Sequence, residues 1–305
     1  MKPRRNSPEN AHCGQCLAGQ DVTCLVRSIA PPDADNDNPN VDLKKRKRGA
    51  SIVVALREVY PQDAGGNPTE AQVTITGASP NTSFTAQVVA GANTGGHQHH
   101  DANRTKGTVA GAGPTSCTGS GPVTCATDTN GYAQLKYTSS EVGGWDNVLV
   151  KMDTGEEGDA IVKVRVPGLL YLPSGTAYTA ESNDVKHPNY RYGNTALINA
   201  IQQIAQAYMA KYNATISVND MSLINGGVFD VKSDWNANPH QCHRKGTSVD
   251  FNRKEIDLNG RAKPVTDIAE KIGSLLVPNN INCRRIVETD PTLAHFECPA
   301  SSICP

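Results

Sequence analysis

Apolar and polar residues alternate in short runs between residues 51 and 168, and each run ends near a glycine, proline, asparagine or aspartate. This pattern is typical of β-strands, because successive side chains of a strand point to opposite faces of the sheet. The predicted strands have the sequences SIVVALREVY, AQVTITG, TSFTAQVVA, GYAQLKYTS, DNVLVKMDT and DAIVKVRVPG. Many short strands with turn residues between them predict an all-β sandwich over residues 49–168.

The apolar period changes after residue 168. In NTALINAIQQIAQAYMAKYN, residues 194–213, apolar side chains recur every three or four positions, which is the stripe of an amphipathic helix. A second helix is predicted in KPVTDIAEKIGSLL, with Pro264 in its first turn. The strand-like pieces TSVDFNR and CRRIVET lie between and after these helices. Residues 169–305 therefore predict an α+β domain.

Residues 1–48 are polar and carry separate blocks of acidic and basic residues, PPDADNDNPNVD and LKKRKRG. Low hydrophobicity and charge blocks predict a disordered lead-in. With 37% apolar residues in 305, the rest of the chain is long enough for two domains, so the expected architecture is multidomain.

The overall charge excludes one class of partner. Lys and Arg number 29 against 30 Asp and Glu, so the net charge of −1 gives no footprint for nucleic acid. No apolar run approaches the roughly 18 residues of a membrane-spanning helix, and the chain is expected not to be transmembrane.

The cysteines predict an oxidising compartment. The segment CTGSGPVTC is typical of a loop closed by a disulfide between Cys117 and Cys125, and CPASSIC predicts the same for Cys298 and Cys304. A chain with such bonds is expected to be secreted or to lie in the cell envelope. The start, MKPRRNSPEN, is basic but lacks the apolar stretch of a secretory signal.

Three further cysteines, Cys13, Cys16 and Cys24, precede the predicted sandwich. The spacing of CGQC suits thiolate ligands of zinc better than a disulfide, but no fourth ligand is in register. Their role stays open.

Another group of candidate ligands lies in GGHQHHDANR, which contains His97, His99 and His100. Strand alternation would let His97 and His99 share a metal ion. The glycines before them and the polar residues after them favour an exposed loop.

The strongest candidate chemistry lies in NPHQCHRKGTSVDFNR, residues 238–253. Gly246 allows a close turn after His243, and Asp250 then lies within a predicted strand, so the two side chains can converge. A catalytic zinc ion needs three protein ligands and one open position. His295, in TLAHFEC, is the candidate third ligand, although a histidine beside Phe296 is more typical of a core residue.

Residues 127–152, TDTNGYAQLKYTSSEVGGWDNVLVKM, resemble the second half of bacterial immunoglobulin-like domains of the invasin type. The resemblance covers about residues 50–168. It implies an immunoglobulin-like module that attaches the protein to a cell surface.

The segment DMSLINGGVFDVKSDW, followed by PHQCHRKGTSVDF, resembles the LAS metallopeptidases, which include murein endopeptidases and D-Ala-D-Ala peptidases. Their motif H-x-x-G-x-[AS]-x-D matches His243, Gly246, Ser248 and Asp250. The resemblance covers roughly residues 185–305 and implies a LAS/hedgehog-like metallopeptidase fold. Its implied zinc ligands are His243, Asp250 and His295.

The chain departs from this family at its end. Murein endopeptidases carry His-x-His there, whereas this chain has HFE, with Glu297 after His295. Peptidases with a Trp-His-Phe or Trp-His-Tyr stretch fit better and imply His295 as the ligand. Glu297 remains an alternative ligand.

The general base is a second departure. The glutamate expected three residues before the last ligand is Thr292, which cannot accept the proton. Asp290 is the preferred candidate, and Glu288 and His240 are the others.

The predicted substrate-binding residues are Arg244, Ser222 and Trp235. The planar guanidinium of Arg244 suits bidentate recognition of a peptide carboxylate, although an exposed surface arginine is the simpler interpretation. Ser222 belongs to the SL-x-x-GG segment that matches the endopeptidases. Trp235 lies between that segment and the motif, and His240 would either orient the substrate or pack against Trp235.

The resemblance implies an enzyme that hydrolyses peptide bonds of peptidoglycan. Zinc would lower the pKa of a bound water from about 16 toward 7, and a nearby carboxylate would accept its proton. The alternative is a non-catalytic protein of the cell surface that binds zinc or glycan on the same fold.

Overall fold

A computed structural model describes residues 51–54, 58–62, 69–91, 96–97, 104–180, 187, 190–230, 241–287 and 293–299, all within one compact unit, Pro39–Pro305. Several predictions concern residues outside these ranges. These are the lead-in 1–48 and the residues Cys13, Cys16, Cys24, His99, His100, Trp235, His240, Glu288, Asp290, Thr292 and Cys304.

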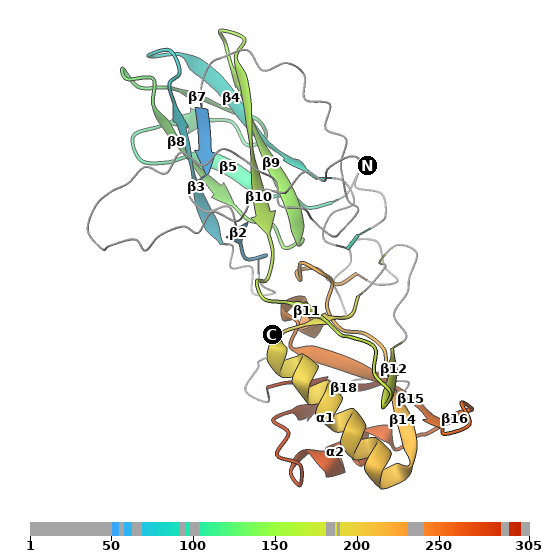
Figure 1. The fold of residues 1–305 in the computed structure, drawn as a ribbon. Helices are drawn as coiled ribbons and strands as arrows, with labels where there is room; N and C mark the ends of the chain where they lie inside the picture. Colours follow the sequence, from blue (N-terminus) through green and yellow to red (C-terminus); the bar gives the residue numbers. More distant parts are fainter. Residues whose placement is uncertain are drawn as a thin grey trace, which may run out of the picture. The chain divides into compact units, whose positions relative to one another are not determined.

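The first half of the described chain forms two sheets whose strands are mostly antiparallel (Figure 1). One sheet has the order β1-β3-β8-β5 and the other the order β2-β10-β9-β4-β7-β6. The first comprises β1 (Ser51–Val54), β3 (Glu70–Thr76), β5 (Thr108–Gly111) and β8 (Ala133–Thr138). The second comprises β2 (Glu58–Val59), β4 (Ser83–Ala90), β6 (Cys117–Thr118), β7 (Val123–Ala126), β9 (Gly144–Met152) and β10 (Glu157–Val164).

One apolar core joins these sheets into a sandwich. Val73 and Leu135 from one sheet and Phe84 and Val148 from the other are buried in the same cluster. Burial alternates along β3 and β4, as the sequence pattern predicts. The single predicted run 51–60 is wrong in one respect, because it divides into β1 and β2, which belong to different sheets.

The second half has a mixed sheet with two helices. Its strand order is β12-β14-β15-β18-β17, and β16 pairs with β15. We call this the C-terminal sheet. Its strands are β12 (Tyr178–Ala180), β14 (Ala214–Val218), β15 (Ser248–Asp257), β16 (Ala262–Pro264), β17 (Arg284–Ile286) and β18 (Leu293–Glu297). A separate two-stranded sheet pairs β11 (Leu170–Tyr171) with β13 (Tyr192–Gly193).

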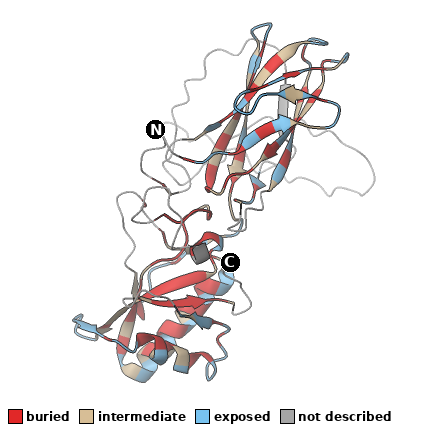
Figure 2. Cartoon of the chain, turned by 180° about the vertical axis from the view of Figure 1, so that it is seen from behind, coloured by how far each residue is buried: buried red, intermediate tan, exposed pale blue. Residues whose placement is uncertain are grey.

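Helices α1 (Thr195–Tyr212) and α2 (Ile268–Leu276) pack against each other and against this sheet (Figure 1). Leu197, Ile201 and Tyr208 of α1 share a buried core with Phe251 and Phe296 of the sheet. Much of β15 and β18 is therefore covered, as the burial colours show (Figure 2). Among the described residues these are the two α-helices, and the fold is mostly β-sheet.

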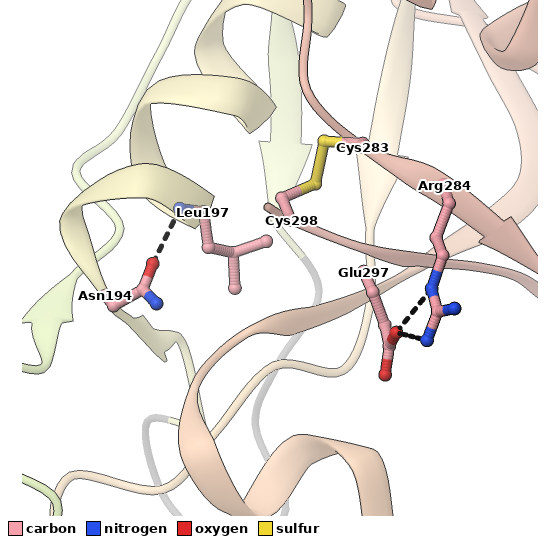
Figure 3. Close-up of a disulfide and its surroundings, with 6 residues drawn as sticks. All are labelled: Asn194, Leu197, Cys283, Arg284, Glu297 and Cys298. Carbon is pink, nitrogen blue, oxygen red and sulfur yellow. Dashed lines mark hydrogen bonds and ion pairs between the residues drawn. A yellow bond between two sulfur atoms is a disulfide. The ribbon is translucent and has the colours of Figure 1, made fainter. Parts of the chain in front are cut away.

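The first helix confirms the predicted stripe and also explains its start. The side chain of Asn194 caps α1, because its Oδ1 accepts a hydrogen bond of 2.8 Å from the backbone N–H of Leu197 (Figure 3). The predicted start of the second helix at Pro264 is wrong. Pro264 lies in β16 opposite Lys254, and α2 begins at Ile268, because the chain first returns along β15.

One predicted disulfide is confirmed and the other is wrong. Cys117 and Cys125 are bonded, whereas Cys298 is bonded to Cys283 rather than paired with Cys304 (Figure 3). Arg284 lies opposite Glu297 in the register of β17 and β18, so Cys283 and Cys298 form the next pair outward. Two disulfides are typical of an extracellular or envelope compartment.

No helix within the described ranges is long and apolar enough to span a membrane. The domain boundaries at 48 and 168 stay predictions.

A buried acid joins α2 to the C-terminal sheet and gives a testable prediction. Glu255 of β15 accepts a hydrogen bond of 2.8 Å from the Nζ of Lys271 and another from the hydroxyl of Tyr208. Burial raises the pKa of Glu255, but these two donors outweigh burial and hold the pKa below its ordinary value. The ionised form therefore stabilises the fold above about pH 4.5, and this contribution is lost as the pH falls through the lowered pKa.

We expect Glu255→Gln to reduce the free energy of unfolding at neutral pH by about 1.5 kcal/mol, because charged hydrogen bonds are lost. The difference from wild type should shrink as the pH falls below about 4, which urea denaturation at several pH values measures. Glu157→Gln is the control, because Glu157 pairs with Lys151 at the surface. Equal losses in the two variants would contradict the prediction.

Candidate metal centre

Three elements bring His243, Asp250 and His295 together, and we call these residues the His243 site. His243 lies in a short 3₁₀ helix, η2 (Gln241–Lys245), and the other two lie on β15 and β18. Asp250 and His295 are direct cross-strand partners, so their side chains emerge on the same face. The structure thus joins the predicted ligand set.

Gly246 makes the approach of His243 possible. Its φ is +66°, a conformation that favours glycine, and a Cβ there would lie 2.3 Å from Leu169 Cδ2. The chain turns at this point from η2 into β15, as the sequence predicts. Ser248 and Asp250 then lie on one face and are both buried.

The carboxylate of Asp250 lies between the two imidazoles. Its Oδ1 is 2.7 Å from Nδ1 of His295, and its Oδ2 is 3.3 Å from Nε2 of His243. The ring centroids of the histidines are 5.2 Å apart and the rings lie nearly edge to face. All three side chains are only 1% exposed.

Electrostatics favour an ionised carboxylate. Burial raises the pKa of Asp250, but the adjacent His243 and His295 lower it further than burial raises it. The net pKa lies well below the ordinary value, so the site offers one negative charge and two ring nitrogens.

This donor set fits zinc. Each of the three residues offers one ligand atom, and these atoms all lie within 4.8 Å of one another. Two imidazoles and one carboxylate are a familiar set for zinc, which binds them at about 2.0–2.2 Å. Ca²⁺ and Mg²⁺ prefer oxygen ligands, so a transition metal suits the site better.

Neighbouring side chains shape the surroundings of the His243 site. The ring of Phe229 lies 4.9 Å from that of His243 and covers it. Glu297 is buried, and its Oε2 accepts hydrogen bonds from Nε and Nη2 of Arg284 (Figure 3). The residues that could hold a metal ion here therefore include His295, and the group does not contain the alternative, Glu297.

The predicted substrate-binding residues within the described ranges are buried. Arg244 is not the exposed surface arginine of the simpler interpretation, because its Nη2 lies 3.0 Å from Oε2 of Glu141. Ser222 is fully buried, and its backbone pairs with that of Tyr192. Trp235 and the candidate bases Asp290, Glu288 and His240 lie outside the described residues.

The sequence did not reveal a second cluster. His97 is buried rather than exposed, and it lies beside His187 and Asp230. These residues come from three separate parts of the chain, so no local spacing signals their approach.

The comparisons with known proteins give distant structural matches. No family model and no curated protein matches the chain. Among solved structures, the adhesin InvE of Yersinia pseudotuberculosis matches at 10% identity, covering 81% of this chain and 69% of that one, with a TM-score of 0.31. The Escherichia coli adhesin FdeC matches at 12% identity, covering 81% of this chain and 54% of that one, with a TM-score of 0.24.

A structure of the AAF fimbriae of enteroaggregative E. coli, which are described as binding fibronectin and forming biofilms, also matches. Its identity is 12%, with 38% of this chain and 99% of that chain covered and a TM-score of 0.25. Likenesses this distant assign no activity to the chain.

The assignment to the LAS metallopeptidases is therefore corrected. No family model and no curated protein supports a peptidase, and the matching structures reported above are not described as peptidases. The predicted function as a hydrolase of peptidoglycan rested on that assignment and is corrected with it. An eight-residue motif specifies a turn followed by a strand, and such a local geometry can hold a metal ion in proteins of other function.

Proposed function

We propose that the chain is a non-catalytic, zinc-binding protein of the cell surface or envelope. Zinc is held by His243, Asp250 and His295, and the immunoglobulin-like sandwich supplies the surface for adhesion or attachment to the cell wall. The observation that carries the proposal is the convergence of three buried donor groups from η2, β15 and β18.

Burial favours a structural role for the ion. The ligand side chains are almost completely shielded from solvent, so an ion bound to them would serve to hold neighbouring elements of the fold together. Zinc at this position would link the turn before β15 to the cross-strand pair of β15 and β18. The carboxylate of Glu297, also on β18, accepts a hydrogen bond from Arg284 and is not part of the ligand group.

The disulfides support an oxidising location. The Cys117–Cys125 disulfide links β6 to β7 at the edge of the sandwich. The Cys283–Cys298 disulfide links the chain beside β17 to the chain beside β18, in the sheet that carries the site. Attachment to a cell surface requires a protein that is stable outside the reducing cytosol.

The test combines zinc analysis with an assay on murein sacculi. Each full-length protein is dialysed against zinc and its bound zinc is measured. We expect His243→Ala to bind one zinc ion fewer than wild type, and Lys245→Ala to bind the same number as wild type. Lys245 is a matched control because it lies in the same 3₁₀ helix but is exposed. Sacculi incubated with the zinc-loaded protein should release no soluble muropeptides.

Two results would contradict the proposal. A zinc content in His243→Ala equal to that of wild type would show that the His243 site does not bind zinc. Muropeptide release that disappears in His243→Ala, but not in Lys245→Ala, would show that the site is catalytic. The assay therefore also tests the enzymatic activity that the family resemblance implies.

A further inference from the structure

A second group of metal-ligand side chains lies outside the His243 site. It consists of His97, His187 and Asp230, which we call the His97 site. The Oδ1 of Asp230 lies 3.1 Å from Nδ1 of His97 and 2.8 Å from Nε2 of His187. As in the His243 site, one carboxylate stands between two imidazoles.

The histidine rings of the two sites are arranged similarly. The rings of His97 and His187 have centroids 5.4 Å apart at an interplanar angle of 79°, against 5.2 Å and 76° in the His243 site. The donor atoms of the His97 site also lie within 4.8 Å of one another. Ligands bound tetrahedrally at about 2.0–2.1 Å lie about 3.3 Å apart, which is close to the observed separations.

The three side chains of the His97 site are buried. The side chains of His97 and His187 are 1% exposed and that of Asp230 is 0% exposed. A carboxylate buried between two imidazoles can be neutralised by a bound cation.

A small apolar cluster holds the three segments in place. Tyr190, Leu223 and Phe229 are buried together, and the rings of Tyr190 and Phe229 meet edge to face with centroids 5.9 Å apart. Tyr190 follows His187 closely in the chain, and Phe229 directly precedes Asp230. The donors therefore extend from a packed scaffold.

His97 is brought to the same scaffold by the glycine before it. Gly96 has a φ of +91°, and a Cβ there would lie 3.2 Å from Leu223 Cδ2. The backbone thus passes close to Leu223 in a conformation that favours glycine. A larger residue at this position would move His97 away from Asp230.

The geometry points to a second transition-metal site at His97, His187 and Asp230, of the class that binds zinc. Its nitrogen-rich donor set suits zinc over calcium or magnesium. Phe229 connects it to the His243 site, because its ring covers His243 and its neighbour is Asp230. The protein then binds two zinc ions, and the second joins three segments that are remote in sequence.

Zinc stoichiometry of the full chain tests this inference. Apo protein, prepared with a chelator, is dialysed against zinc and analysed for bound metal. We expect two ions in wild type, one in His187→Gln, one in His295→Gln and none in the double variant. The His295→Gln protein serves as the matched control, since it removes one ligand from an equivalent buried triad.

A second variant guards against a failure to fold. Asp230→Asn preserves side-chain shape and removes the charge, and near-UV circular dichroism verifies that each variant is folded. Co²⁺ bound in place of zinc gives visible absorption, and its intensity per protein should fall in His187→Gln and in Asp230→Asn as it does in His295→Gln.

The outcomes separate the two sites. Equal metal content in wild type, His187→Gln and Asp230→Asn would overturn the second site and leave the His243 site intact. One ion in wild type that is lost in His187→Gln, but kept in His295→Gln, would support the second site and contradict the proposed function.

Discussion

Saturation of the His243 site with zinc is expected to raise the free energy of unfolding by about 4 kcal/mol when free zinc exceeds the Kd about a thousandfold. The reason is that the three donors meet only in the folded chain. His243 precedes the turn at Gly246, while Asp250 and His295 are partners across two strands. Urea denaturation of apo and zinc-loaded protein measures the difference.

Asp250→Asn should remove this gain, because Asp250 is the residue that contacts both imidazoles. Any stabilisation from the His97 site is the same in both proteins, so the difference between them belongs to the His243 site. Asp153→Asn, at an exposed position in the sandwich, is the control and should keep the full gain. A zinc-induced gain of equal size in Asp250→Asn would rule out zinc at this position.

Removal of the Cys283–Cys298 disulfide is expected to lower the free energy of unfolding by about 3 kcal/mol, the usual loss for a closed loop of about 15 residues. The cysteines are separated by 15 positions, and the bond closes the loop that contains His295. We expect the double variant Cys283→Ser/Cys298→Ser to bind zinc at the His243 site more weakly as well, because β17 and β18 are less firmly joined.

The other disulfide provides the control for this experiment. Cys117 and Cys125 are separated by 8 positions, and the double serine variant should lose about 2.5 kcal/mol by the same relation. Its zinc affinity should equal that of wild type, since the bond lies in the sandwich. Equal zinc affinity in both double variants would disprove the link between the Cys283–Cys298 bond and the site.

The sequence predicted the local parts of the candidate site. His243, Gly246 and Asp250 lie within one turn and one strand, so their relation follows from backbone geometry and strand alternation. The apolar stripe of α1 could also be predicted, because it depends only on the spacing of residues within one helix. His295 could be joined to this set only through the family resemblance. Its position opposite Asp250 is a matter of strand pairing, which residue spacing does not encode.

The predictions that failed depended on long-range register. Cys298 bonds to Cys283 because β17 and β18 are neighbours, although Cys304 is closer in sequence. His97 was interpreted as exposed because its partners, His187 and Asp230, lie far along the chain. The assignment to a peptidase family extended a short motif to the activity of a whole protein, which a local match cannot support.

The Cys117–Cys125 bond also bears on self-association. Strand β6 has only two residues and forms the outer edge of its sheet, where it pairs with β7. A strand this short would fray readily, and the uncovered backbone of β7 would then offer its hydrogen-bonding groups to another copy of the chain. Because the covalent bond holds β6 against β7, we expect reduction of this disulfide to expose the backbone of β7 and to favour aggregation through it.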